Sequence, residues 1–364
     1  MKKPLTVREI AEKAGVSLGT VSRVMNNAAN IDPELKEHTL SVIRANNYVP
    51  LRRPRRNSRR NAAEGGRIAV LFCDISFEWS DSYFSRSYAE GIGEVCAAYR
   101  VRAEFFTLQN FCDDAFFKRL SEFDGILIKH VFHPGDERIE QINSLTETIP
   151  VVGFGTNLAS CRYPQIFFDN RSAGELAAEE LFRRGHRVIA FINTDPDNAM
   201  FCARANGFRE TMEHYGLWEA NLFFDRKVAT ITPFSLDPIP PLLGKTLDHI
   251  LNAPKKATAA VVVNDWGCVG LYRACAERSV RIPEDLSILG FDNQISICAS
   301  LSPPLSSISN PLADIGKGAA MELISRIDAK SRGVKVPLNS RLLSGTLIER
   351  DSFADITANN KETK

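Results

Sequence analysis

The sequence predicts an N-terminal three-helix helix-turn-helix headpiece followed by a larger α/β domain. In the first 50 residues, apolar side chains recur at helical spacing around a glycine suited to a tight turn. From residue 68 to about 351, short apolar runs alternate with helix-like segments. Residues 1–64 carry 13 Lys or Arg against 6 Asp or Glu, whereas the rest carries 32 against 38. A basic end on an acidic body is typical of a nucleic-acid-binding module attached to a globular domain.

Composition and length exclude several classes of protein. With 364 residues, of which 44% are hydrophobic and 24% charged, the chain can bury more than one core. No apolar run approaches the roughly 18 residues of a membrane span. The opening residues have no apolar stretch of the kind found in secretory signals, so we expect a cytoplasmic protein with no membrane partner.

The chemistry-bearing residues favour a binding protein over an enzyme. The eight cysteines include no Cys-x-x-Cys pair, which predicts reduced thiols rather than disulfides or a zinc site. His130 and His133 lie close together but lack a carboxylate or cysteine at ligand spacing, so we expect no metal. Phosphate-loop, metalloprotease and serine-hydrolase motifs are absent from the sequence. We therefore expect no cofactor and no catalytic residues.

The first two helices are predicted from their caps and their apolar faces. Thr6 and Glu9 form a capping box, in which each side chain satisfies a free backbone N–H at a helix start. Gly15 tolerates the positive φ of a tight turn, and Ser17 caps a second helix. The apolar residues expected to face inward are Val7, Ile10, Ala11, Ala14, Val21 and Val24. Two short helices joined by a glycine turn form a helix-turn-helix.

A third helix is predicted from Asp32, its N-cap, through about Asn46, with Leu40 and Ile43 facing the same small core. The exposed side of the second helix carries short hydrogen-bonding side chains suited to phosphate oxygens, namely Ser17, Thr20, Ser22 and Asn26. Arg23 on the same helix can reach guanine bidentately. This surface favours DNA binding over the alternative of a three-helix bundle without a DNA role.

This region resembles the DNA-binding end of the LacI/GalR family of bacterial repressors. The matching residues are Thr6 to Ala11, Ala14 to Ser17, Thr20 to Val24, and Asn26. The resemblance implies that Leu18, Gly19 and Arg23 occupy base-reading positions. Arg23 should carry much of the readout, because glycine reads nothing and leucine only contacts a thymine methyl group. The DNA-binding residues that we expect in the headpiece, residues 1–50, are Thr6, Ser17, Leu18, Gly19, Thr20, Ser22, Arg23, Asn26, Asn30 and Tyr48.

An arginine-rich linker, residues 51–66, departs from the family pattern. Asn57 stands where the family has a leucine that enters the minor groove, and Pro54 falls inside the would-be hinge helix. Two interpretations stay open. The arginines enter the minor groove or follow the phosphates, or they form a tether that adds only non-specific attraction. The arginines concerned are Arg52, Arg53, Arg55 and Arg56.

The α/β domain is predicted over residues 67–351, with a disordered tail at 352–364. The apolar runs expected as buried strands are 68–72, 124–128, 149–153, 188–192, 259–263 and 286–291. The helix-like segments between them include 172–184, 204–215 and 265–278. Continuous apolar strands alternating with helices indicate parallel sheets covered on both faces. Ligands of such sheets bind beyond the carboxyl ends of the strands.

The LacI/GalR resemblance extends over this domain. It rests on Phe168-Asp169-Asn170 with Gly174, Arg184 to Arg187, Arg204 with Gly207, Val263 to Asp265, Gly290 to Asn293, Pro303 to Ile308, and Gly345 to Arg350. It implies a periplasmic-binding-protein-like effector domain, in which two α/β lobes are joined by three crossovers and hold the ligand between them. The residue after the third strand of the first lobe is often polar in the family, whereas this chain has Gly153-Phe154-Gly155. The ligand therefore cannot be transferred from any one relative.

By the same resemblance, Arg204 is the effector-binding arginine, and Asn264, Asp265 and Asp292 lie in pocket loops. For Asn264 and Asp292 the alternative is that each caps a turn. Phe77 and Trp79, just after the first strand, are expected to stack on a sugar ring, with core packing as an equal alternative.

Together these features predict a transcription regulator, more consistent with repression. Its homodimer would bind a near-palindromic operator under control of a small molecule, expected to be a sugar or sugar derivative. A purine whose ring stacks on Phe77 or Trp79 is a narrower alternative. The alternatives of another class are a sugar-binding protein of a transporter and an enzyme acting on sugars, neither with a gene-regulatory role.

Overall fold

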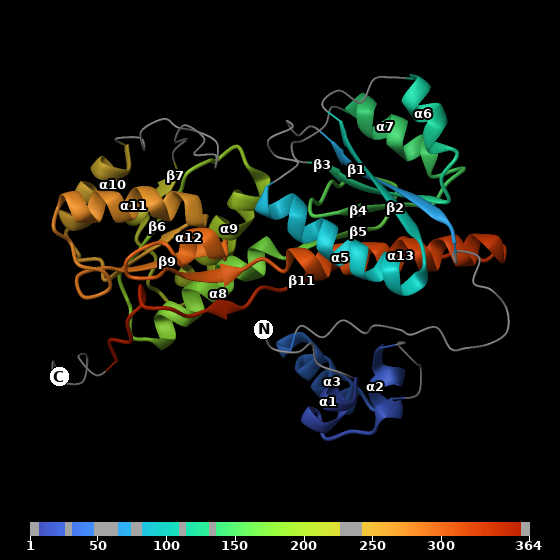
Figure 1. Ribbon diagram of the computed structural model, residues 1–364. Helices are drawn as coiled ribbons and strands as arrows, with labels where there is room; N and C mark the ends of the chain where they lie inside the picture. The colour runs from blue at the N-terminus through green and yellow to red at the C-terminus, as the bar shows by residue number, and fades with distance from the viewer. Residues whose placement is uncertain are drawn as a thin grey trace. The chain divides into compact units, whose positions relative to one another are not determined.

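The computed structural model describes residues 7–25, 31–46, 65–73, 82–108, 114–130, 136–225 and 242–357 (Figure 1). The chain divides into two compact units. Unit 1 comprises Met1–Phe167 and Leu312–Leu343, and unit 2 comprises Phe168–Pro311 and Ser344–Lys364. The chain therefore passes from one unit to the other three times, which confirms the expected two lobes with three crossovers.

The headpiece is the predicted three-helix module. Its helices are α1 (Val7–Lys13), α2 (Leu18–Met25) and α3 (Pro33–Ala45). Ile10, Ala11 and Val21 form its small core, and Ile43 of α3 packs against them. The turn between α1 and α2 uses Gly15 at φ +63°, the left-handed conformation that favours glycine.

Of two detailed predictions for the headpiece, one is confirmed and one is wrong. Asp32 caps α3 as expected, because its Oδ1 accepts a 3.0 Å hydrogen bond from the backbone N–H of Leu35. Val7, expected to face inward, is 36% exposed. It is the first residue of a short helix, so it lies at the end of the apolar face rather than over the core.

Beyond the headpiece, unit 1 is built on a six-stranded sheet covered by helices on both faces. Its strand order is β11-β5-β4-β3-β1-β2, and β1 to β5 pair in parallel. The strands are β1 (Arg67–Cys73), β2 (Arg102–Leu108), β3 (Gly125–His130), β4 (Val151–Phe154), β5 (Gln165–Phe168) and β11 (Arg341–Leu343). Figure 1 shows α5 (Tyr83–Tyr99) and α13 (Leu312–Ser331) on one face, and α6 (Asp114–Leu120) and α7 (Asp136–Leu145) on the other.

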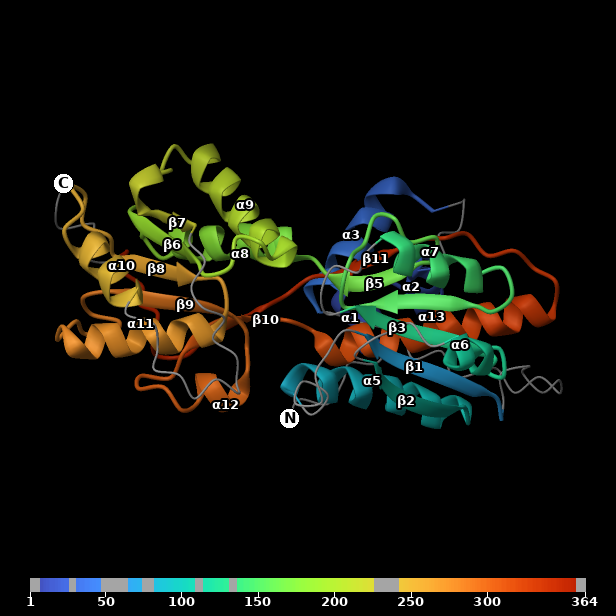
Figure 2. The same ribbon diagram turned by 90° about the horizontal axis from the view of Figure 1, so that it is seen from above.

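Unit 2 repeats this arrangement with strand order β12-β10-β9-β8-β6-β7. Figure 2 shows its strands β6 to β10 from above. Strands β6 to β10 pair in parallel, and β12 runs antiparallel to β10. The strands are β6 (Ile189–Asn193), β7 (Phe223–Asp225), β8 (Ala259–Val262), β9 (Ser287–Asp292), β10 (Ser306–Ser309) and β12 (Leu347–Ile348). The helices are α8 (Asn170–Arg183), α9 (Ala199–His214), η1 (Ala220–Leu222), α10 (Leu242–Leu251), α11 (Asp265–Glu277) and α12 (Ile295–Cys298).

The shared topology determines where each unit can bind a ligand. In both sheets the first strand along the chain lies between the second and the third, so the strand order reverses at β1/β3 and at β6/β8. The connections on either side of such a switch point leave opposite faces of the sheet and open a crevice at the carboxyl ends of the strands. The residues that follow these strands are therefore the ones placed to contact a ligand.

The predicted disordered tail is wrong for its first residues. Ser352 and Phe353 are buried, and the Ser352 hydroxyl donates to the Ile288 carbonyl at 2.7 Å. Further along, the backbone N–H of Ile356 donates to the Arg184 carbonyl. A short polar sequence without periodicity gave no sign of these contacts, because they are made with unit 2 residues far away in the sequence.

Neither a membrane-spanning helix nor a metal-binding cluster is present among the described residues. None of their helices is long and apolar enough to cross a membrane. Among the same residues, no group of three or more His, Cys, Asp or Glu side chains is placed to hold a metal ion.

Candidate functional site

The second headpiece helix has one buried and one exposed side. Val21 and Val24 are buried, whereas Leu18 is 47% exposed. Gly19 and Arg23 are also exposed. A leucine this exposed on a short helix is not part of the headpiece core, which fits the predicted contact with a thymine methyl group. The expected base-reading positions therefore share the side of α2 that faces away from the core.

Ser17 and Thr20 stabilise the start of this helix. The Ser17 Oγ accepts a 3.0 Å hydrogen bond from the backbone N–H of Thr20, and the two hydroxyls lie 2.9 Å apart. Ser17 is exposed and Thr20 is half-buried. The same hydroxyls can thus cap the helix and present hydrogen-bonding groups at its surface.

Several predicted site residues lie outside the described part of the chain. For Ser22 the helix is described but the side chain is not. The others are Thr6, Asn26, Asn30, Tyr48, Arg52, Arg53, Arg55, Arg56, Phe77 and Trp79. Their roles stay predictions.

Arg204 is the centre of a buried polar cluster in unit 2. It is only 2% exposed, and three of its nitrogens donate hydrogen bonds. Its Nη2 donates to Asp292 at 2.7 Å, its Nε to Asn170 at 2.9 Å, and its Nη1 to the Val263 carbonyl at 2.8 Å. The Asp292 carboxylate also neutralises its charge, as a buried ion needs. The cluster thus joins the carboxyl ends of β8 and β9 to the first turn of α8.

Three phenylalanine rings surround the guanidinium. The rings of Phe168, Phe201 and Phe291 have their centroids 5.1 to 5.6 Å from the Arg204 Cζ. A cation over aromatic rings gains quadrupole attraction, and the rings also exclude water. Arg204 is therefore held in a fixed orientation by both charge and shape.

Two glycines allow Arg204 to take this position. A Cβ on Gly174 of α8 would lie 1.9 Å from the Arg204 carbonyl oxygen. A Cβ on Gly207 of α9 would lie 2.1 Å from the Arg171 carbonyl oxygen. The backbones of α8 and α9 therefore touch where the helices cross. Gly174 and Gly207 of the sequence motifs are therefore required by packing, because no side chain fits between these two helix backbones.

Asn264 and Asp265 have structural partners at the start of α11. Asn264 is the N-cap residue, and its Oδ1 accepts a 2.8 Å hydrogen bond from Gly267 N–H, which matches the capping alternative. Asp265 is fully buried, and its oxygens accept hydrogen bonds from the Ser307 hydroxyl and the Gln294 backbone N–H. Burial, together with the nearby charge of Asp292, raises the pKa of Asp265 to about 7.

Asp292 does not cap a turn; it ends β9 and pairs with Arg204. It has φ +94°, and the next residue, Asn293, has φ +50°. The Asn293 side chain accepts a 2.7 Å hydrogen bond from Arg350, and its backbone N–H donates to the Ser307 hydroxyl. These bonds hold a backbone conformation that L-residues rarely adopt, and such strain is concentrated at functional sites.

Sequence reasoning missed three buried polar atoms near the same strand ends. Asp195 follows β6, Trp266 follows β8, and Gln294 follows β9. Within the described part of the chain, Asp195 Oδ1, Trp266 Nε1 and Gln294 Nε2 have no hydrogen-bond partner. Buried polar groups are normally paired, so a ligand that bonds them would remove a free-energy cost. The available signal was position, because each follows an apolar strand within a few residues.

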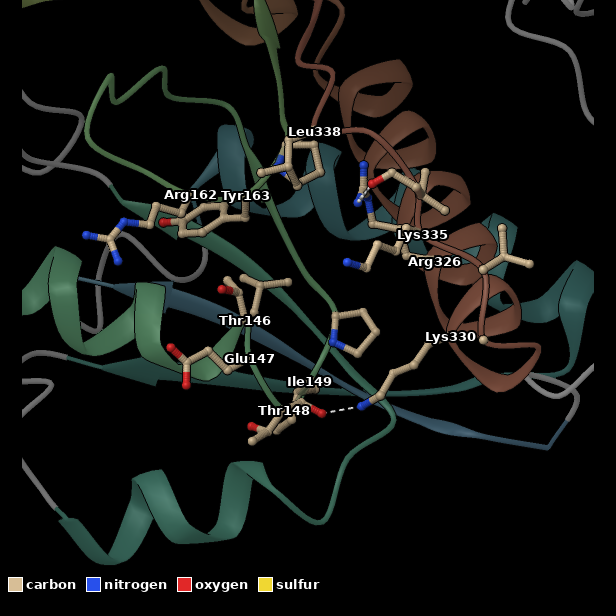
Figure 3. Close-up of a pocket in the computed structure, with 16 residues that line it drawn as sticks. Thr146, Glu147, Thr148, Ile149, Arg162, Tyr163, Arg326, Lys330, Lys335 and Leu338 are labelled. Atoms are coloured by element: carbon tan, nitrogen blue, oxygen red, sulfur yellow. Dashed lines mark hydrogen bonds between the residues drawn. The ribbon is translucent and has the colours of Figure 1, made fainter.

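A groove of about 460 Å³ in unit 1 contains none of the predicted effector residues (Figure 3). It is lined by residues that precede β4 and β5 and by the last turns of α13. Lys330 extends across it and donates to the Thr148 carbonyl. The groove thus lies at the amino ends of these strands, whereas the ligands of parallel sheets bind at the carboxyl ends.

Comparison with known proteins finds similarity along nearly the whole chain. The model described as "Bacterial regulatory proteins, lacI family" matches residues 6–50, and that of the "Periplasmic binding protein-like domain" matches residues 178–353. The transcriptional repressor CytR of Escherichia coli K12 is 29% identical over 95% of this chain and 96% of its own length.

Solved structures share the fold. A complex of the transcriptional regulator CelR with cellobiose is 23% identical, with a TM-score of 0.61 over 96% of this chain and 99% of that chain. The lac repressor dimer bound to operator and the anti-inducer ONPF is 20% identical, with a TM-score of 0.60 over 97% of this chain and 100% of that chain.

Proposed function

Because the chain belongs to the LacI family of bacterial transcription regulators, we propose that two copies of it bind a near-palindromic operator and respond to a carbohydrate effector. The chain is a DNA-binding regulator controlled by a small molecule, and it is not an enzyme. The proposal goes beyond this in four points: the symmetry of the operator, the dimer, repression as the outcome, and the class of effector.

The observation that carries the DNA-binding part is the two-sided character of α2. Val21 and Val24 fix the helix to the headpiece core, and Leu18 and Arg23 lie exposed on it. A short helix held in this way can enter the major groove with its first turns against base edges. A dimer presents two such helices to matching half-sites, which favours a palindrome.

The effector part is supported by the polar cluster around Arg204. Asp195, Trp266 and Gln294 each contribute an unpartnered buried polar atom at the strand ends of unit 2 within the described residues. A carboxylate oxygen, an indole N–H and an amide N–H suit the hydroxyl groups of a sugar. The cellobiose bound by the similar regulator CelR is consistent with this class. An effector that binds one conformation of the units better than another changes operator affinity, and DNA changes effector affinity by the same factor.

Selection from random duplex DNA with the purified full-length chain tests the proposal. At near-physiological salt we expect enrichment of one palindrome whose half-site centres lie about one helical turn, or 10 base pairs, apart. Carbohydrates would then be screened for a change in affinity for that palindrome. Enrichment of an asymmetric site, or binding that salt abolishes without any sequence preference, would contradict the proposal.

The linker arginines give a second expected result. Replacing Arg52, Arg53, Arg55 and Arg56 with alanine should reduce affinity for the selected operator more than affinity for random DNA, because we propose that they enter the minor groove. Replacing the same four with lysine keeps the charge and serves as the control. The tether interpretation predicts instead that affinity for the operator and for random DNA falls by the same factor. The slope of log affinity against log salt concentration would then become shallower by about 0.9 per lost phosphate contact.

A further inference from the structure

We propose that the effector carries an anionic group, a carboxylate or a phosphate, and that Lys129 in unit 1 binds it. This inference rests on the proposed effector control and specifies the chemistry of the ligand. It concerns a residue that the sequence analysis passed over, because the apolar run 124–128 ends just before it. In the structure β3 continues through Lys129 to His130.

Lys129 lies at the switch point of the unit 1 sheet. It is the second-to-last residue of β3, and it pairs with Phe72 of β1 across the position where the strand order reverses. The crevice at the carboxyl ends of these two strands is where a ligand of this sheet is expected. A lysine here interrupts a strand that is otherwise buried along its length.

The ammonium of Lys129 has polar contacts but no counter-charge among the described residues. Its Nζ donates to the Thr156 hydroxyl at 3.3 Å and lies 5.2 Å from the centre of the Tyr88 ring. The side chain is half-buried. Burial lowers the pKa of Lys129 to about 8, so the amine is still protonated at neutral pH but at a cost in free energy. A bound anion would remove that cost.

Gly155 leaves room for this ammonium. It follows β4 with φ +76°, and a Cβ at this position would lie 2.9 Å from Lys129 Nζ and 2.7 Å from the Tyr88 hydroxyl oxygen. Any larger residue would displace one of the two polar groups. The missing side chain at Gly155 thus leaves space for the Lys129 ammonium of the neighbouring strand.

The buried cation of unit 2 is already paired. Arg204 is the buried cation at the strand ends there, and Asp292 already neutralises it. An anionic group that approached Arg204 would meet the Asp292 carboxylate beside it. Within the described residues, Lys129 is therefore the better receptor for a negative charge at the carboxyl end of either sheet.

Calorimetry on the full-length chain without DNA tests this inference apart from operator control. The probes are glucose as the neutral reference, gluconate and glucuronate as carboxylates, and glucose 6-phosphate and inorganic phosphate as phosphates. We expect at least one anion to bind better than glucose, and to bind roughly ten- to hundredfold more weakly to Lys129→Met. Lys330→Met is the matched control, because it also removes a lysine charge from unit 1, but at the amino ends of the strands.

Each outcome of the calorimetry has a distinct meaning. If carboxylates alone bind, the effector is a sugar acid or related acid; if phosphates alone bind, it is a phosphorylated compound. The inference is wrong if no anion binds better than glucose, or if the preferred anion binds Lys129→Met as well as the wild-type chain. A preferred anion that needs Lys129 but leaves operator affinity unchanged would support the inference and contradict the proposed function. Thermal unfolding of Lys129→Met at or above the wild-type temperature excludes loss of folding as the cause.

Discussion

Replacing Arg204 with alanine is expected to destabilise unit 2 by about 3–5 kcal/mol, because it leaves a buried carboxylate without its counter-charge. Asp292 is 4% exposed and accepts its 2.7 Å hydrogen bond from Arg204. The same substitution removes the donors to Asn170 and to the Val263 carbonyl. Denaturant unfolding followed by tryptophan fluorescence measures the effect, because Trp218 and Trp266 both lie in unit 2.

Two control variants test the cause of this effect. Arg281→Ala breaks an exposed pair with Asp285 in the same unit and should change the unfolding free energy little. Combining Arg204→Met with Asp292→Leu removes both buried charges, so the double variant should lose less than the two single variants together. If Arg204→Ala proved as mild as Arg281→Ala, the cluster would not be what holds the strand ends of unit 2.

The parts of the fold that the sequence predicted well are those with local signals. Gly15 and Asp32 mark a turn and a helix start within a few residues of the apolar faces that they border. Each of the six predicted apolar runs lies within two residues of an observed strand, as 188–192 does against β6, since continuous apolar runs are characteristic of buried parallel strands. The short parallel strands β5, β7 and β10 were not among the predicted runs. β2 was missed because it lies at the edge of its sheet and alternates polar and apolar residues.

The parts that escaped prediction depend on partners far away in the sequence. The resemblance named Arg204 and Asp292 separately, but their pairing joins residues 88 positions apart. Asp265 was expected to bind the effector, whereas its carboxylate is fully buried and accepts the hydroxyl of Ser307, 42 positions away. A role for it as an effector ligand stays a prediction. Lys129 escaped prediction for a local reason. A charged residue directly after an apolar run indicates that a buried strand has ended, whereas this strand continues.

Replacing Arg23 with alanine is expected to weaken binding to the selected operator by about 1–3 kcal/mol, roughly five- to 150-fold, while binding to random DNA falls much less. Arg23 is exposed on α2, so its loss should leave the headpiece core of Ile10, Ala11 and Val21 intact. Because Gly19 has no side chain and Leu18 is apolar, no other base-reading position on this helix can replace a bidentate contact to guanine. Titrations of labelled operator and random duplex, both at one stated salt concentration, measure the difference.

Arg23→Lys distinguishes base reading from simple charge. Lysine keeps the positive charge but lacks the planar fork that contacts both acceptors of guanine. We therefore expect Arg23→Lys to retain random-DNA affinity and its salt dependence, and to lose most of the operator preference that Arg23→Ala loses. If lysine restored full preference, Arg23 would act on the phosphates, and specificity would come from Leu18 or from the shape of the DNA.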